Sequence, residues 1–341
     1  GDIREMRTIP DADLEIVVLA DRAEGWTDDR LPGVGDWTSA KLIEVEPDGF
    51  TELDDLGELN MGDPAVLADF VVRGVTDYPS DHYAVVLWNH GAISGVGSDD
   101  SSDDGLTLPE IGAAFESALT STGLDRIDLI GFDACMMGAY EVATTVAPYG
   151  TFMIGSEENE PNSGWDYTAF DHLAAEPQAT PQSLGEAIVD RYIATTADDS
   201  PKVTLSMIDL HRVGDLVTAL EAFNAEVIPN IDDYAAYIGR QLTRTDSFAS
   251  SPNPAENWFM FDLGQLMRRL SRHESGLGTV AAEVNRALDD AVVTTQSGRT
   301  HPKASGLSVH FPTYPDWYFA DWYNRIEVPV WTEFLDAYYA A

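Results

Sequence analysis

The segment IDLIGFDACMMGAYEVA, residues 127–143, contains Cys135, the only cysteine of the 341-residue chain. Residues 127–132 form an apolar run typical of a buried strand, Gly131 and Ala134 leave room for a sharp turn, and residues 137–146 have the apolar spacing of a helix. Backbone N–H groups at a helix start favour an anion, so a thiol at this junction is favoured as the reactive thiolate. The alternative is an inert cysteine that packs as a small hydrophobic side chain.

A second predicted strand ends in a histidine. Residues 83–88, YAVVLW, lead directly into Asn89, His90 and Gly91. Parallel strands joined by one crossover helix, here residues 108–121, place their carboxyl ends at the same sheet edge. We therefore expect His90 to lie near Cys135, where a histidine can assist thiol attack. This position distinguishes His90 from the histidines that are expected to be structural or exposed, which are His82, His172, His211, His273, His301 and His310.

Strand and helix signals alternate along the chain. We expect strands at residues 14–20, 83–88, 127–132, 151–154, 203–208 and 307–311, and an antiparallel excursion at 37–45 that ends in a turn at 47–49. Helices are expected at 64–75, with Asp63 as N-cap, and at 108–121, 137–146, 181–196, 211–229 and 277–293. The alternation predicts an α/β fold, a mostly parallel sheet with helices on both faces. Without an internal repeat or long linker, residues 1–341 are expected to form one elaborated domain.

The charge balance is strongly acidic. The chain has 59 acidic and 19 basic residues and a formal net charge of −40, so a nucleic acid would be repelled over most of the surface. With 44% hydrophobic residues, however, a substantial core can form. The combination is typical of an acidic, halophilic protein from a haloarchaeon, whose carboxylates are screened in concentrated salt. A single cysteine excludes an intramolecular disulfide, and we expect no membrane span.

Five motifs follow one another in order along most of the chain. They are WNHGA at 88–92, SDDGLTLPEI at 102–111, GFDACMMGAYEVA at 131–143, GSEENEPNSGWDY at 155–167 and SGLSVHFP at 305–312. Together they resemble the clostripain family of cysteine peptidases, whose clan includes caspases, gingipains and legumain. The resemblance implies a caspase-like three-layer sandwich and a thiol protease that uses a Cys/His dyad.

The resemblance also implies a role for each residue of the dyad. Cys135 would attack the scissile carbonyl and form a thioester acyl-enzyme, and His90 would protonate the departing amine and then help to activate water. The backbone N–H groups of Gly91 and Cys135 would form the oxyanion hole, where the absence of a Cβ on Gly91 allows close approach of the substrate.

Substrate preference is implied by an aspartate two residues before the nucleophile. In the resembled family this residue, here Asp133, lies in the primary specificity pocket, where a carboxylate favours Arg or Lys before the scissile bond. The alternative is that Asp133 caps the following helix. Ser156, Glu157 and Glu158 follow a neighbouring strand and are candidates for the pocket wall, with an ordinary solvated acidic loop as the alternative.

A cluster of acidic residues between His90 and Cys135 has two interpretations. Asp99, Asp100, Asp103 and Asp104 could hold Ca²⁺, on which clostripain-like enzymes can depend. The spacing is not that of an EF-hand, and dense aspartate in such an acidic chain is also typical of solvated surface. We expect the thiol chemistry itself to require no cofactor. No His-x-x-x-His pair occurs, so a metal-dependent hydrolase ranks last.

The chain departs from the family pattern in two places. Members of the family can mature by self-cleavage after a basic residue between the histidine and the cysteine, but residues 91–125 contain no Lys or Arg. The family's first core strand would precede residues 2–6 and is absent, which suggests that the numbering begins inside a larger precursor and leaves a sheet edge exposed.

The sequence therefore predicts a cysteine endopeptidase that acts on peptides or proteins with basic residues. The competing hypothesis is a catalytically silent binding or scaffold domain, which would have no need of both Cys135 and His90. We expect a monomer without a membrane span. By the habit of relatives, we expect it to be secreted or held at the cell surface.

Overall fold

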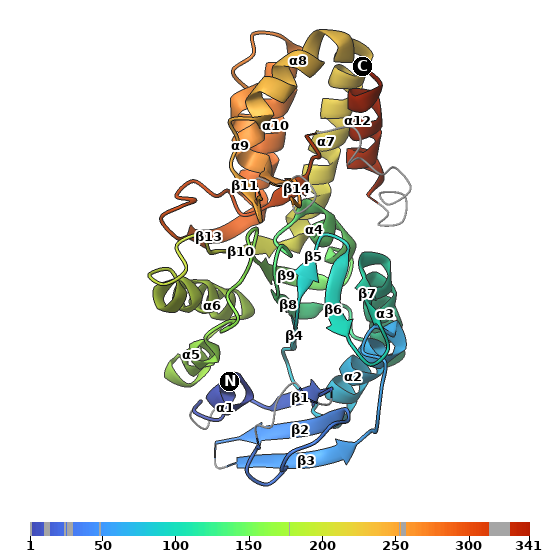
Figure 1. Ribbon diagram of the computed structural model, residues 1–341, viewed down its shortest axis with the longest axis vertical. Coiled ribbons are helices and arrows are strands. Elements are labelled where there is room, and N and C mark those ends of the chain that lie inside the picture. The colour runs from blue at the N-terminus through green and yellow to red at the C-terminus, as the bar shows by residue number, and fades with distance from the viewer. Residues whose placement is uncertain are drawn as a thin grey trace.

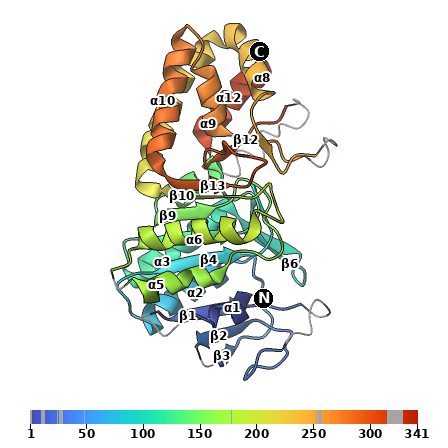
Figure 2. The same cartoon turned by 90° about the vertical axis from the view of Figure 1, so that its left-hand side faces the viewer.

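The computed structural model describes residues 2–9, 14–23, 25, 30–47, 49–176, 178–251, 253, 257–313 and 328–341. Within these ranges, none of the helices combines the length and the apolar character needed to cross a membrane. A central sheet lies between a small N-terminal sheet at one end of the molecule and a group of C-terminal helices at the other (Figures 1 and 2).

The central sheet has five strands in the order β13-β10-β9-β8-β4. Strands β4, β8 and β9 pair in parallel, and β10 runs antiparallel to both β9 and β13. Four of the five strands therefore point the same way, and the predicted mostly parallel sheet is confirmed. The bounds are β4 (Ala84–Trp88), β8 (Ile127–Asp133), β9 (Gly150–Gly155), β10 (Thr204–Asp209) and β13 (Val292–Ser297).

Helices cover both faces of this sheet, as the sequence predicts. Along β8, Ile130 and Phe132 face a core shared with α2 (Pro64–Asp77), α3 (Leu108–Thr122), α4 (Tyr140–Val146), α7 (Val213–Val227) and α10 (Gly276–Ala291). Leu129 belongs to a second core with α6 (Pro181–Thr196), near α5 (Asp171–Ala175) and η1 (Tyr167–Phe170). Alternate strand residues point to opposite faces, so the two cores define three layers.

The C-terminal helices stand above one end of the central sheet (Figure 2). They are α8 (Ile231–Leu242), α9 (Leu263–Leu270) and α12 (Pro329–Ala340), together with the upper parts of α7 and α10. The turns η2 (Leu210–Arg212) and η3 (Ile228–Asn230) flank α7. A small antiparallel sheet of β11 (Ser247–Phe248), β12 (Met260–Asp262) and β14 (Ser308–His310) connects these helices to the region of the nucleophile.

The N-terminal strands form a sheet of their own. The predicted strand at 14–20 is present as β1 (Ile16–Ala20), but it pairs with β2 (Lys41–Glu46), which pairs with β3 (Gly49–Asp55). The turn predicted at 47–49 includes residue 48, which lies outside the described residues. Helix α1 (Asp2–Met6) contacts η1, and β4 is the edge strand of the central sheet among the described residues.

Local sequence signals account for the helices nearest the candidate site. Asp63 caps α2 by accepting a hydrogen bond from the N–H of Ala65, as predicted. Helix α3 begins with a capping box between Thr107 and Glu110 and ends at Gly123, which adopts a left-handed conformation with φ +73°. These signals fix both ends of the crossover helix between β4 and β8.

Candidate active site

The strand register brings the ends of β4 and β8 together. Trp88 pairs with Asp133, and these residues precede His90 and Cys135 by two positions, so the segments that carry His90 and Cys135 follow adjacent parallel strands at the same edge of the sheet. The backbone of Gly91 packs directly on the nucleophile turn, because a Cβ placed on it would lie 2.3 Å from the carbonyl oxygen of Cys135. As the sequence predicts, the two strands are therefore neighbours, and their carboxyl ends lie at the same edge of the sheet.

Cys135 is partly exposed, and its thiol contacts a neighbouring loop. The backbone N–H of Glu160 donates to Cys135 Sγ across 3.3 Å. The imidazole of His90 makes no hydrogen bond to this thiol or to another described residue, and His90 is exposed at the strand end.

The structure corrects one expectation about the nucleophile. Cys135 does not stand at the start of a helix, because α4 begins only at Tyr140. Met136 has φ +59°, a left-handed conformation that interrupts a helix, and Ala139 forms a parallel bridge with Ser308 instead. The donor that faces the thiol therefore comes from residue 160, in a different loop, and the argument from a helix N-terminus is wrong.

Asp133 is buried at the end of β8 and is only 3% exposed. Its carboxylate accepts hydrogen bonds from the backbone N–H of Trp165 at 3.1 Å and from the hydroxyl of Tyr167 at 2.9 Å. Burial raises the pKa of the carboxyl group, although these hydrogen bonds oppose the shift. Gly164 adjoins it, since a Cβ there would lie 2.8 Å from Asp133 Oδ2. Asp133 does not act as the N-cap of α4, which begins after Ala139.

Further acidic residues gather around Asp133. The carboxyl group of Glu160 lies beside it, and burial together with the Asp133 charge raises the pKa of Glu160 well above its ordinary value. The indole N–H of Trp165 donates to Glu160 Oε1 at 3.4 Å. On α1, Glu5 accepts a hydrogen bond from the backbone N–H of Tyr167, and the charge of Asp133 contributes to a raised pKa of Asp2.

Sequence reasoning did not single out Glu160, Asp2 or Glu5. Glu160 lies inside the motif GSEENEPNSGWDY, so the motif itself was the available signal. Asp2 and Glu5 are more than 120 residues from Asp133 along the chain, and only the packing of α1 against η1 brings them near it.

Ser156 and Glu157 are buried, but the structure does not place them with Asp133. The Ser156 hydroxyl donates to the carbonyl oxygen of Glu158 at 2.9 Å and lies 3.1 Å from Thr204 Oγ1. Glu157 Oε2 accepts a hydrogen bond from the backbone N–H of Gly306 at 3.1 Å. Burial raises the pKa of Glu157 well above its usual value. Nor are these residues a solvated acidic loop, because Ser156, Glu157 and Glu158 are 0%, 1% and 3% exposed.

The predicted acidic residues after His90 do not form one group. Asp99 is buried and accepts backbone N–H groups from Met61, Ser101 and Ser102. Asp104 instead bonds Asn60, and Asp100 and Asp103 are exposed.

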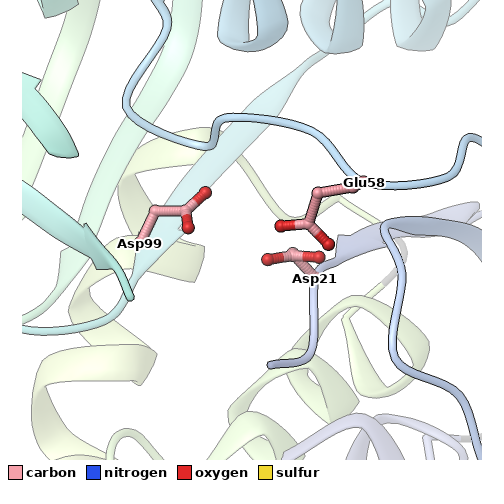
Figure 3. Close-up of side chains that lie close together, drawn as sticks. All are labelled: Asp21, Glu58 and Asp99. Carbon is pink, nitrogen blue, oxygen red and sulfur yellow. The ribbon is translucent and has the colours of Figure 1, made fainter. Parts of the chain in front are cut away.

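Asp99 meets two carboxylates that are distant in sequence (Figure 3). Oxygen atoms of Asp21, Glu58 and Asp99 all lie within 4.8 Å of one another. Burial and the two neighbouring charges raise the pKa of Asp21, and its buried Oδ1 atom has no hydrogen-bond partner among the residues that the structure describes. Three carboxylates with an unsatisfied oxygen match the oxygen ligands that Ca²⁺ prefers.

Comparison with known proteins places these features in context. A family model described as the clostripain family matches residues 1–316. Clostripain from Hathewaya histolytica is 29% identical over 171 residues, which are 43% of this chain and 32% of that protein. The match thus spans about a third of the length of this relative.

Solved structures have the same fold. An inactive zymogen C11 protease from Parabacteroides distasonis has a TM-score of 0.66 and 17% identity, with 95% of this chain and 92% of that chain covered. A secreted C11 cysteine protease from Bacteroides thetaiotaomicron, in complex with an irreversible peptide inhibitor, has a TM-score of 0.65 and 19% identity, with 96% and 93% covered. The predicted caspase-like α/β fold is therefore confirmed.

Proposed function

Because this chain belongs to the clostripain family of cysteine peptidases, we propose that it is an endopeptidase in which Cys135 is the nucleophile and His90 the general acid and base. The observation that supports the proposal is the parallel register of β4 and β8, in which Trp88, two residues before His90, pairs with Asp133, two residues before Cys135. The backbone of Gly91, which follows His90, also packs directly against the backbone of Cys135.

The proposed reaction has two steps. The Cys135 thiolate attacks the scissile carbonyl carbon, an S–C bond forms, and the carbonyl electrons move to the oxygen. When the C–N bond breaks, protonated His90 gives its proton to the departing amine, which leaves a thioester. Water then attacks the thioester carbon while His90 accepts a proton from it, the S–C bond breaks, and the acid product leaves.

The negative oxygen that forms in each step needs hydrogen-bond donors. We propose the backbone N–H groups of Gly91 and Cys135. Supporting this, the Cys135 N–H donates no hydrogen bond to another described residue, and the two backbones are in contact. Fixed N–H donors are effective here because they need no rearrangement as the charge develops.

The proposed specificity is for Arg or Lys before the scissile bond. The buried carboxylate of Asp133 and the carboxyl group of Glu160 beside it would form the acidic floor of the specificity pocket, and Asp2 and Glu5 lie near Asp133 on α1. A cationic side chain would relieve the repulsion among these carboxyl groups. An apolar side chain would leave it unrelieved, which is the physical basis of the preference.

Calcium is a separate proposal. Asp21, Glu58 and Asp99 would hold the ion, and its charge would offset the repulsion among three carboxylates. It would tie the loops after β1 and β3 to β6 (Gly95–Asp99), which pairs with β5 (Gly91–Ala92) and β7 (Asp104–Thr107). No step of the peptide hydrolysis needs it.

We also propose where the protein acts, whether it is processed and in which oligomeric state it works. One structural relative is described as secreted, which supports export of this protein. Residues 91–125 contain no Lys or Arg, so we propose that the chain acts without self-cleavage in that segment. We also propose that it is a single-domain monomer, because a net charge of −40 opposes association at low salt.

One assay tests the function. Fluorogenic peptides ending in Arg, Lys, Asp or Leu are incubated with the protein in high salt, with and without Ca²⁺, beside a Cys135→Ala variant. We expect release from the Arg or Lys peptide by the wild type alone. A wild type that releases nothing under any condition contradicts the peptidase and supports the scaffold hypothesis, whereas preference for Asp or Leu contradicts only the pocket assignment.

A further inference from the structure

The loop at residues 156–160, here called the brace segment, holds the nucleophile turn at three points. The N–H of Gly138 donates to the carbonyl oxygen of Ser156 at 2.7 Å, and the N–H of Met136 donates to that of Glu158 at 3.2 Å. The third contact is the N–H of Glu160 to the Cys135 sulfur at 3.3 Å. The position of the thiol therefore depends on where the brace segment lies.

The nucleophile turn needs such support. Met136, next to Cys135, has φ +59°, a left-handed conformation that is strained for a residue with a Cβ. Residues in such conformations persist when their surroundings hold them there. The hydrogen bond from the Met136 N–H to Glu158 is one of the contacts that do so.

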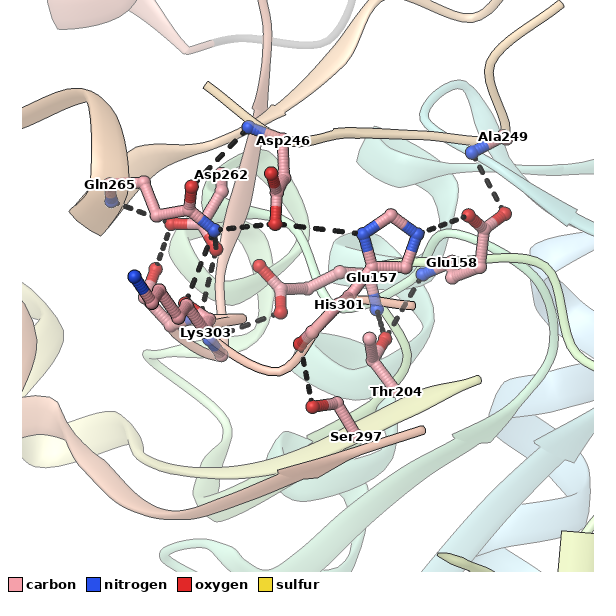
Figure 4. A network of polar contacts seen from close by, with 12 residues as sticks. Glu157, Glu158, Thr204, Asp246, Ala249, Asp262, Gln265, Ser297, His301 and Lys303 are labelled. Atoms are coloured by element: carbon pink, nitrogen blue, oxygen red, sulfur yellow. Dashed lines mark hydrogen bonds and ion pairs between the residues drawn. The ribbon is translucent and has the colours of Figure 1, made fainter. Parts of the chain in front are cut away.

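The brace segment is itself anchored through the side chain of Glu158. This carboxylate is 3% exposed and accepts the backbone N–H groups of Asn159 at 2.9 Å and Ala249 at 2.8 Å. Its second oxygen lies 3.4 Å from Nε2 of His301 (Figure 4). A buried carboxylate without such partners would be strongly disfavoured, so these partners decide where Glu158 sits.

His301 is the one side chain among these partners. It is 7% exposed, lies in the loop after β13, and places its other ring nitrogen 3.7 Å from Asp246 Oδ2. The ring also packs against Phe248, with centroids 5.0 Å apart. Figure 4 shows the imidazole between the two carboxylates, within a network that includes Glu157 and Asp262.

We propose that His301 is a positioning residue for the nucleophile. Its buried ring lies between the carboxylates of Glu158 and Asp246, with one ring nitrogen within 4 Å of each, and so fixes the brace segment that holds Cys135. This role rests on the proposed function, in which Cys135 reacts. His301 itself touches neither the thiol nor the substrate.

The first test compares His301→Gln with the wild type, and the exposed His211→Gln is the matched control. A misplaced nucleophile lowers kcat more than KM, so we expect kcat per folded molecule to fall about ten- to a hundredfold with little change in KM. The rate of Cys135 alkylation by iodoacetamide is expected to fall severalfold, because the Glu160 donor is displaced. His211→Gln should change neither quantity.

The second test is a double-mutant cycle with Glu158→Gln. If His301 acts through Glu158, the double variant loses no more than the stronger single variant. Losses that multiply, or a folded His301→Gln protein with wild-type kcat and alkylation rate, overturn the proposal. If His301→Gln does not fold, Asp246→Asn keeps the imidazole and removes one partner, and is expected to slow alkylation to a smaller extent. Alkylation needs no peptide hydrolysis, so this readout still tests the positioning role if the wild type is not a peptidase.

Discussion

The backbone N–H of Glu160 donates a hydrogen bond to the Sγ atom of Cys135 across 3.3 Å. The carboxyl group of the same residue lies beside the buried carboxylate of Asp133. One residue thus contacts both the thiol and the acidic group proposed to select the substrate. Because Glu160 contacts both groups, a change in the charge of Asp133 is expected to affect the environment of the Cys135 sulfur as well as the substrate preference.

Replacing Asp133 by Asn is expected to weaken the preference for basic substrates. Loss of a buried charge partner costs about 3–5 kcal/mol, so the ratio of kcat/KM for an Arg peptide to that for a Leu peptide should fall about a hundredfold or more. The ratio is measured on one sample and does not depend on the fraction of folded protein. Glu160→Gln should lower it less. An unchanged ratio in Asp133→Asn would falsify the pocket assignment.

A methyl group on Gly91 should abolish or strongly reduce activity. The Cβ of Gly91→Ala would lie 2.3 Å from the carbonyl oxygen of Cys135, so the proposed oxyanion donors must separate. We expect kcat to fall by about 10²-fold or more. Gly214→Ala in α7, whose Cβ meets nothing within 4 Å, is the control and should stabilise the helix by about 0.5–1 kcal/mol. Equal activity of the two variants contradicts the prediction.

Glu141 is expected to make stability depend on pH. Complete burial raises the pKa of this carboxyl group from 4.5 to about 7, so the folded protein holds a proton that the unfolded chain releases. The resulting decrease in the free energy of unfolding is absent below pH about 4.5, grows as the pH rises, and reaches about 3 kcal/mol above pH 7.

The Glu141→Gln variant removes this titration and leaves the acceptor for the His310 N–H in place. The difference between the Tm of Glu141→Gln and the Tm of the wild type should therefore be larger, in favour of the variant, at pH 8 than at pH 4.5. Differential scanning calorimetry at the two pH values measures the difference. A Tm difference that does not change with pH would show that folding does not raise the pKa of Glu141.

Calcium is expected to raise the Tm by binding Asp21, Glu58 and Asp99. Asp21→Asn should lose most of this shift, and without calcium it should melt at a higher temperature than the wild type because one repelling charge is gone. The exposed Asp100→Asn variant is the control and should respond like the wild type. Equal calcium shifts in all three proteins would exclude this cluster as the site.

Much of the fold could be predicted from local patterns. Apolar runs such as 127–132 and caps such as Asp63 depend on near neighbours in the chain, so they indicate strands and helix ends directly. The strand at 14–20 was predicted, but its pairing with β2 in a separate sheet was not, since pairing depends on partners that apolarity does not specify.

The sequence by itself determined the α/β class, the family, and the expectation that His90 and Cys135 leave neighbouring strands at one edge. Only the tertiary structure decided which side chains surround them. Glu157 and Glu158 are adjacent to the site in sequence, yet their carboxyl groups turn toward Gly306 and His301. The physical reason is that a buried carboxyl group goes where hydrogen-bond partners exist, and those partners come from packed segments far along the chain.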